Sequence, residues 1–115
     1  MAYKSIVLHE KSTGDYFYEE AIKTLRTNLQ FSGKNNKVIL LTSSYASEGK
    51  SDTCFNLAKE LGKAGKKVLL IDADIRKSVY KSRYDIQEDT NGLSQYLSGQ
   101  LERIDDVVYK TNFED

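Results

Sequence analysis

The 115-residue chain contains no proline, one cysteine and one histidine. A single cysteine, Cys54, excludes an internal disulfide, and its place among apolar helix positions predicts a packed thiol. The one histidine, His9, stands in a segment without metal-ligand spacing, so it is expected at the surface. With no proline and only seven glycines, the sequence indicates neither a linker nor a low-complexity stretch.

The chain also has little net charge and no long apolar run. Its 17 basic residues balance 17 acidic ones, which implies no bulk attraction to nucleic acid or to anionic lipid. Its apolar runs are far shorter than the ~20 residues that span a bilayer. The run at the N-terminus is too short for a signal peptide. We therefore expect a cytoplasmic protein that does not bind nucleic acid.

A phosphate-binding motif follows the first apolar run. Residues 38–41 are uninterrupted and partly β-branched, which predicts a strand buried on both faces. Residues 44–51 then read Ser-Tyr-Ala-Ser-Glu-Gly-Lys-Ser, with Ser44 where such loops usually have Gly or Ala. Main-chain amides of such a loop surround an anion, Lys50 reaches the outer phosphates and the Ser51 hydroxyl takes Mg²⁺. The predicted cofactor-binding residues are Ser47, Glu48, Gly49, Lys50, Ser51 and Asp52.

An amphipathic helix is predicted after this loop, and Gly65 is expected to end it. Residues 67–71 form a second apolar run, predicted to be a buried strand parallel to the first because crossover connections are right-handed. The apolar stripe of the helix comprises Cys54, Leu57, Ala58, Leu61 and Ala64, and Lys59, Glu60, Lys63 and Lys66 fall outside it.

Two carboxylates follow the second strand. Asp72 and Asp74 lie on the same side if the strand continues, because side chains alternate with period two, and Arg76 falls on that side too. One or both can then face a Mg²⁺ held by Ser51, as metal-assisted phosphoryl transfer requires. The alternative is a helix cap formed by Asp72 or Asp74 at a turn near Ile75.

Together these segments resemble the bacterial tyrosine kinases of capsule and exopolysaccharide synthesis. The resemblance covers roughly residues 17–112 and includes a Gly-Leu-Ser segment that continues to a Leu and a Gly. The residues that carry it are 20–32, 43–51, 56–58, 72–77 and 92–99.

This resemblance implies a magnesium–ATP site and an (auto)kinase that phosphorylates tyrosines beside a membrane adaptor or chain-length regulator. Lys50 and the loop amides would hold the phosphates, Ser51 and an acidic residue the metal, and Asp72 or Asp74 would help to activate the attacking tyrosine hydroxyl. Tyrosine-containing proteins are the implied substrates. The implied catalytic residues are Lys50, Asp72 and Asp74, and the implied metal ligands are Ser51, Asp72 and Asp74.

The sequence departs from the family pattern at several positions. Ala46-Ser47 stands where the family often has Pro-Gly, and Asp52 where it often has Thr, which brings an extra carboxylate to the phosphates. The segment linked to packing of neighbouring subunits in a homo-oligomer appears as Glu20, Lys23 and Arg26, and Lys lacks the planar fork of Arg. The same helix, 17–32, also reads simply as amphipathic.

No third run of four or more apolar residues follows Asp74, although a P-loop domain needs further central strands. We therefore predict an α/β fold with a P-loop NTPase-like parallel sheet flanked by helices, present only as its N-terminal half. Within it, residues 1–16 are an N-terminal extension, 17–32 a helix, 37–76 the nucleotide-binding βαβ unit, and 77–115 a helical or irregular remainder, with a short helix near 91–98.

Two other functions compete with the kinase. A P-loop ATPase of the partition or division-site type carries a second lysine five positions before the motif lysine, and Tyr45 occupies that place here. A catalytically inert, truncated module could bind nucleotide, or bind a partner through its first helix, without turning over ATP.

Overall fold

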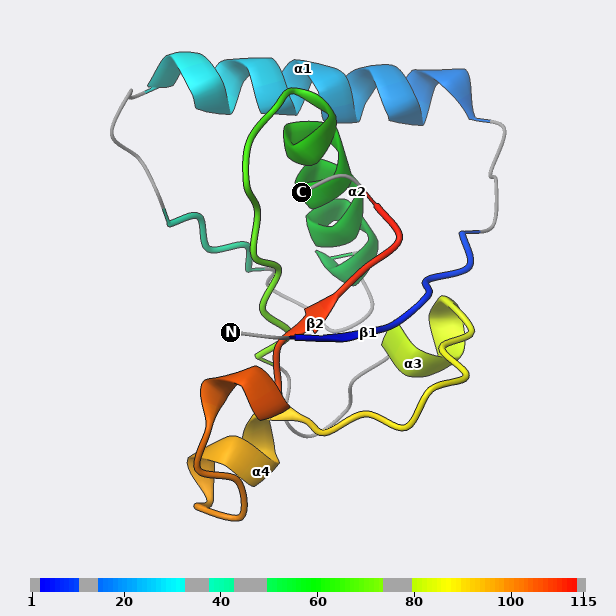
Figure 1. Ribbon diagram of the computed structural model, residues 1–115. Coiled ribbons are helices and arrows are strands. Elements are labelled where there is room, and N and C mark those ends of the chain that lie inside the picture. The colour runs from blue at the N-terminus through cyan, green and yellow to red at the C-terminus, as the bar shows by residue number, and fades with distance from the viewer. Residues whose placement is uncertain (1–2, 11–14, 33–37, 43–49, 74–79, 114–115) are drawn as a thin grey trace. The chain divides into compact units, whose positions relative to one another are not determined.

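The computed structural model describes residues 3–10, 15–32, 38–42, 50–73 and 80–113. The chain divides into two compact units, and each is described by itself (Figure 1). The helical unit comprises Thr13–Leu70 with the last two residues. The sheet unit comprises Met1–Ser12 and Ile71–Phe113.

Helix α1, Tyr16–Ser32, opens the helical unit. Its first turn is capped by Asp15, whose side-chain Oδ1 accepts a hydrogen bond from the main-chain N–H of Tyr18 at 3.1 Å. Ile22 is 5% exposed, and the other apolar positions expected on its face, Tyr18, Leu25 and Leu29, are partly buried. The predicted amphipathic helix at 17–32 is therefore confirmed.

Helix α2, Lys50–Lys63, ends as the sequence predicts. Gly65 adopts φ +88°, its N–H donates to the carbonyl of Gly62 at 3.0 Å, and the N–H of Lys66 donates to Leu61 at 3.1 Å. These two bonds form the paired pattern that closes a helix on a left-handed residue. Gly65 thus satisfies the last carbonyls and turns the chain back along α2.

Helix α1 packs across α2, and the contact encloses a charged group. Phe55 and Leu57 are 4% and 3% exposed, and burial of each such side chain contributes about 1.5–3 kcal/mol. Glu60 is also buried, at 8% exposed, although the sequence places it outside the apolar stripe. Its Oε2 lies 3.3 Å from Nη1 of Arg26 on α1, and its Oε1 lies 3.5 Å from Nζ of Lys63. The partners on both oxygens explain why this carboxylate can leave the solvent.

The two apolar runs predicted as buried strands are not strands. Residues 38–42 and 66–73 have no secondary-structure assignment, and Val38 and Leu40 are 91% and 86% exposed. Leu69 is 64% exposed, whereas its neighbours Val68 and Leu70 are partly buried. A strand buried on both faces needs neighbouring strands and a layer on each side, and the described part of the helical unit covers one side only. The prediction that these two runs are strands buried on both faces is therefore wrong.

The sheet unit holds a parallel pair that the sequence did not predict. Strand β1, Lys4–Ser5, pairs with strand β2, Tyr109–Lys110, with Lys4 opposite Tyr109. The N–H of Ile6 continues the pairing by donating to the carbonyl of Lys110 at 2.8 Å. Asn112 then bonds both main-chain groups of Leu8, accepting from its N–H at 2.8 Å and donating to its carbonyl at 3.1 Å. Residues 4–8 are thus part of the fold.

Short helical turns complete the sheet unit. Helix α3 is Tyr80–Arg83, helix α4 is Leu93–Leu97, and a 3-10 turn covers Ile104–Asp106. The short helix expected near 91–98 is confirmed by α4. Tyr84 is 5% exposed and its ring stacks on that of Tyr80, and Tyr109 donates its hydroxyl to the carbonyl of Asp106 at 3.4 Å. His9 is exposed, as expected. Within the described ranges, no helix is long and apolar enough to cross a membrane.

The end of α2 gives a first testable prediction. Gly65→Ala should destabilise the chain by about 1–2 kcal/mol, because an L side chain at positive φ strains the backbone. A Cβ at this position meets no atom within 4 Å, so crowding adds nothing to the cost. Gly65→Asn should cost less, since Asn tolerates the left-handed region better. Urea unfolding measures both, and equal losses for Ala and Asn would contradict the conformational explanation.

The pair between α1 and α2 gives a second prediction. Arg26→Met should lower the free energy of unfolding by about 1–3 kcal/mol, because it removes a charged hydrogen-bond partner from buried Glu60. The matched control is Lys23→Met, which breaks the 3.8 Å pair with Glu20 between side chains that are 45% and 47% exposed. That change should cost below about 0.5 kcal/mol. The double variant Arg26→Met/Glu60→Met should recover part of the loss, and equal losses for Arg26→Met and Lys23→Met would refute the assignment.

Candidate functional site

The structure describes part of the predicted phosphate loop. Residues 43–49 lie outside the described residues, and these include Ser47, Glu48 and Gly49. At Lys50 the main chain enters α2, although its side chain is not described. The motif therefore meets the helix at its lysine, and the loop directly precedes the first turn of α2.

The first turn of α2 carries two of the predicted ligand-binding residues. Ser51 and Asp52 are both half-buried there. The first four N–H groups of an α-helix have no partner within the helix, and the helix dipole places partial positive charge at this end. An anion is stabilised at such a terminus, and a serine hydroxyl one residue into the helix can bind a cation beside that anion.

The side chain of Asn56 connects this turn to α1. The amide of Asn56 donates to the carbonyl of Asp52 at 2.8 Å and to the hydroxyl of Tyr18 on α1 at 3.3 Å. Asn56 thus joins the N-terminal half of α2 to α1, on the same contact that buries Glu60. The contact between Asn56 and Tyr18 was not predicted, because nothing in a separation of 38 residues indicates that two helices touch.

The predicted acidic residues belong to the other unit. Asp72 is half-buried in a segment without assigned secondary structure, and Asp74 lies outside the described residues. Ser51 and Asp72 fall in different units, so each is placed within its own unit only. Among the residues that the structure describes, no three acidic, histidine or cysteine side chains are grouped as a metal site would need. The proposed metal set includes Asp74, which is not among them.

The three residues expected at a subunit contact behave differently from one another. Glu20 and Lys23 pair with each other across one turn of α1, on the surface. Arg26 instead lies against α2, where it holds Glu60. Its Nε is buried and has no hydrogen-bond partner in the described contacts, whereas its Nη1 donates to Oε2 of Glu60 at 3.3 Å. The sequence treated the three as one set, whereas the structure separates Arg26 from the other two.

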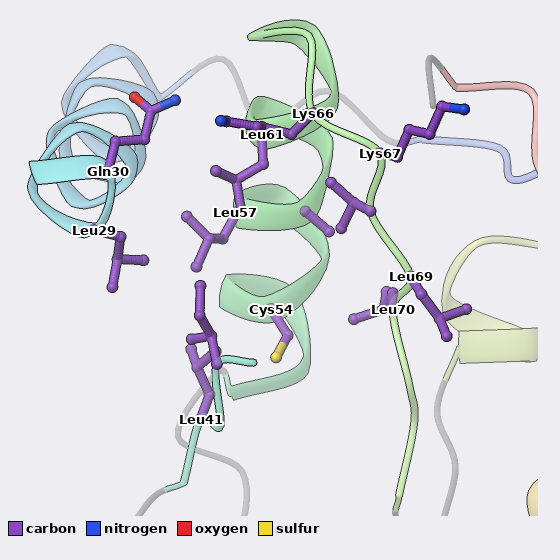
Figure 2. Close-up of a pocket in the computed structure, with 13 residues that line it drawn as sticks. Leu29, Gln30, Leu41, Cys54, Leu57, Leu61, Lys66, Lys67, Leu69 and Leu70 are labelled. Carbon is purple, nitrogen blue, oxygen red and sulfur yellow. The ribbon is translucent and has the colours of Figure 1, made fainter. Parts of the chain in front are cut away.

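A cavity of about 690 Å³ lies beside α2 in the helical unit (Figure 2). One wall is the apolar stripe of α2, and the others are the non-helical segments 38–42 and 66–70 with the C-terminal end of α1. Figure 2 shows Leu57, Leu61 and Cys54 on the helix and Lys66–Leu70 on the segment running back beside it. The stripe was predicted from spacing, but the cavity was not, since the two segments were predicted to be buried parallel strands.

Comparisons with known proteins identify the family of the chain. The model of a family described as an AAA domain matches residues 36–115. A tyrosine-protein kinase CpsD of Streptococcus agalactiae is 46% identical over 94 residues, which are 82% of this chain and 41% of that protein. The CpsD of Streptococcus pneumoniae is 44% identical over 81 residues, 70% of this chain and 36% of that protein.

A relative of lower identity is also a tyrosine-protein kinase. The tyrosine-protein kinase YwqD of Bacillus subtilis is 42% identical over 80 residues, which are 68% of this chain and 33% of that protein. The chain thus spans about two fifths or less of the length of these relatives. No solved structure gives a significant match. The relatives confirm the resemblance to bacterial tyrosine kinases. Because the AAA domain model covers residues 36–115, the chain belongs to the AAA domain family.

Proposed function

We propose that the chain is the nucleotide-binding part of an ATP-dependent protein-tyrosine kinase that regulates capsular or exopolysaccharide biosynthesis. The observation that carries this proposal is the start of α2 at Lys50, directly after a loop that reads as a phosphate-binding motif. The kinase names of the relatives support the reaction type.

In this proposal the loop amides of Ser47, Glu48 and Gly49 hold the phosphates of ATP, and Lys50 reaches the outer ones. Ser51, on the first turn of α2, directs its hydroxyl to Mg²⁺, and Asp52 lies beside the same phosphates. When bound, Mg²⁺ neutralises charge that develops on the transferred phosphoryl group. Asp72 and Asp74 would together hold the metal and accept the proton of the tyrosine hydroxyl.

The contact between α1 and α2 holds the helix that begins this site. Because Asn56 and Glu60 tie α2 to α1, the direction of the helix dipole is fixed relative to the rest of the helical unit. A fixed dipole stabilises phosphate without reorganisation when the ligand arrives.

The partners follow from the same proposal. A membrane adaptor or chain-length regulator would recruit a cytoplasmic kinase to the inner face of the membrane, and tyrosine-containing proteins would be its substrates. For a homo-oligomer, Glu20 and Lys23 have exposed side chains, whereas Arg26 already pairs with Glu60. Glu20 and Lys23 are therefore the better candidates for a subunit contact, whereas Arg26 binds Glu60 on α2.

Nucleotide binding is testable on this chain. Lys50→Ala should weaken Mg²⁺–ATP binding about tenfold or more, because it removes the cation that reaches the outer phosphates. The control is Lys81→Ala, which removes the same charge from an exposed position on α3 and should leave binding unchanged. Titration calorimetry measures both, and equal affinities for Lys50→Ala and the unaltered chain would remove the phosphate-loop assignment.

Turnover separates the kinase from the inert module. Asp72→Asn should lower phosphate transfer to tyrosine about a hundredfold, because an amide is a poorer Mg²⁺ ligand than a carboxylate and cannot accept the hydroxyl proton. Transfer is measured as phosphotyrosine by mass spectrometry after incubation with Mg²⁺–ATP. If the unaltered chain binds ATP and forms no phosphotyrosine, the inert nucleotide-binding module is the better description. If it releases inorganic phosphate without labelling tyrosine, the ATPase alternative gains instead.

A further inference from the structure

A series of three hydrogen bonds connects the start of α1 to the first turn of α2. It begins at Asp15, whose Oδ1 accepts from the main-chain N–H of Tyr18 at 3.1 Å. The hydroxyl of Tyr18 accepts from the side-chain amide of Asn56 at 3.3 Å, and the same amide donates to the carbonyl of Asp52 at 2.8 Å. All four residues belong to the helical unit. The capped end of α1 is thus bonded to the residue that directly follows Ser51.

Asn56 occupies a position that helix propensity disfavours. Asparagine in a helix interior is less favourable than alanine, because its short amide competes for main-chain hydrogen bonds. An amide nitrogen carries two N–H donors, and this one has two acceptors, one on each helix. A single side chain therefore reaches the first turn of its own helix and the neighbouring helix together.

The bonds of Asn56 act at the end of α2 that begins the proposed nucleotide site. They hold the carbonyl of Asp52, and Ser51 is the residue before it. The ion pair of Arg26 and Glu60 joins the same two helices, but Glu60 lies about two turns further along α2. The two contacts therefore fix different parts of the helix, since the ion pair holds its middle and the amide holds its first turn.

We propose that Tyr18 is a positioning residue of the nucleotide site: through Asn56, its hydroxyl holds the first turn of α2 in the conformation that directs Ser51 to magnesium and the main-chain N–H groups to phosphate. This inference rests on the proposed nucleotide binding and adds to it a residue from the other helix. Helix ends fray, because their terminal groups lack partners within the helix. A bond that orders the first turn beforehand removes a cost that would otherwise oppose ATP binding.

Tyr18→Phe tests this role, because it removes only the hydroxyl. It should weaken Mg²⁺–ATP binding about fivefold, the equivalent of one ordinary hydrogen bond, as measured by titration calorimetry. The control is Tyr16→Phe, which removes the hydroxyl of a tyrosine that is 66% exposed on the same helix and should leave the affinity unchanged. Urea unfolding is measured alongside, because a merely structural role would shift the unfolding midpoint and leave the affinity of the folded chain unchanged.

A double-mutant cycle tests whether the hydroxyl acts through Asn56. Asn56→Leu removes both bonds of the amide at a similar side-chain volume and should weaken binding at least as much as Tyr18→Phe. In the Asn56→Leu background, Tyr18→Phe should weaken binding no further. Circular dichroism checks that each variant keeps its helices. Two losses that multiply in the double variant would show that the hydroxyl does not act through the amide, and would overturn the proposal.

The outcomes separate this inference from the nucleotide proposal itself. If Lys50→Ala loses ATP binding while Tyr18→Phe binds like the unaltered chain, the positioning role is refuted and the phosphate-loop assignment stands. If Tyr16→Phe weakens binding as much as Tyr18→Phe, the effect belongs to any change on α1 and the role of this hydroxyl is again refuted. If the unaltered chain binds no Mg²⁺–ATP, both proposals fail together.

Discussion

The helical unit depends on one buried carboxylate. Glu60 can lie inside the contact between α1 and α2 because Arg26 reaches one of its oxygens and Lys63 the other. Charges out of water are costly without such partners, so the contact permits only an arrangement in which Arg26 faces α2. The apolar packing of Ile22 and Leu57 supplies much of the burial, and the ion pair joins α1 to α2 at Arg26 and Glu60.

Local features of the sequence predicted local structure well. The span of α1, the end of α2 at Gly65 and the short helix α4 all follow from periodicity and from residues that start or stop helices. The resemblance to bacterial tyrosine kinases also came from short segments, and the relatives confirm it. The candidate site was predicted by motif, and the structure adds that its lysine and serine begin α2.

Contacts distant in the sequence could not be predicted. Nothing in the spacing of Glu60 indicates that its partner is Arg26, 34 positions earlier, because a carboxylate among lysines usually marks a solvated face. Strand β1 was missed for the same reason, since its two residues pair with a segment more than a hundred positions away. The two apolar runs were interpreted as buried strands because composition reports that a segment is suited to burial and does not report whether a covering layer exists.

These two runs also explain why α2 carries a larger apolar stripe than its contact with α1 requires. Phe55 is almost fully buried, yet Cys54, Ala58 and Leu61 face a cavity. The segments 38–42 and 66–70 cover part of this stripe with Ile39, Leu41, Val68 and Leu70. The same helix thus begins at the lysine of the phosphate-loop motif and lines the cavity with its apolar side, and its contact with α1 orients both.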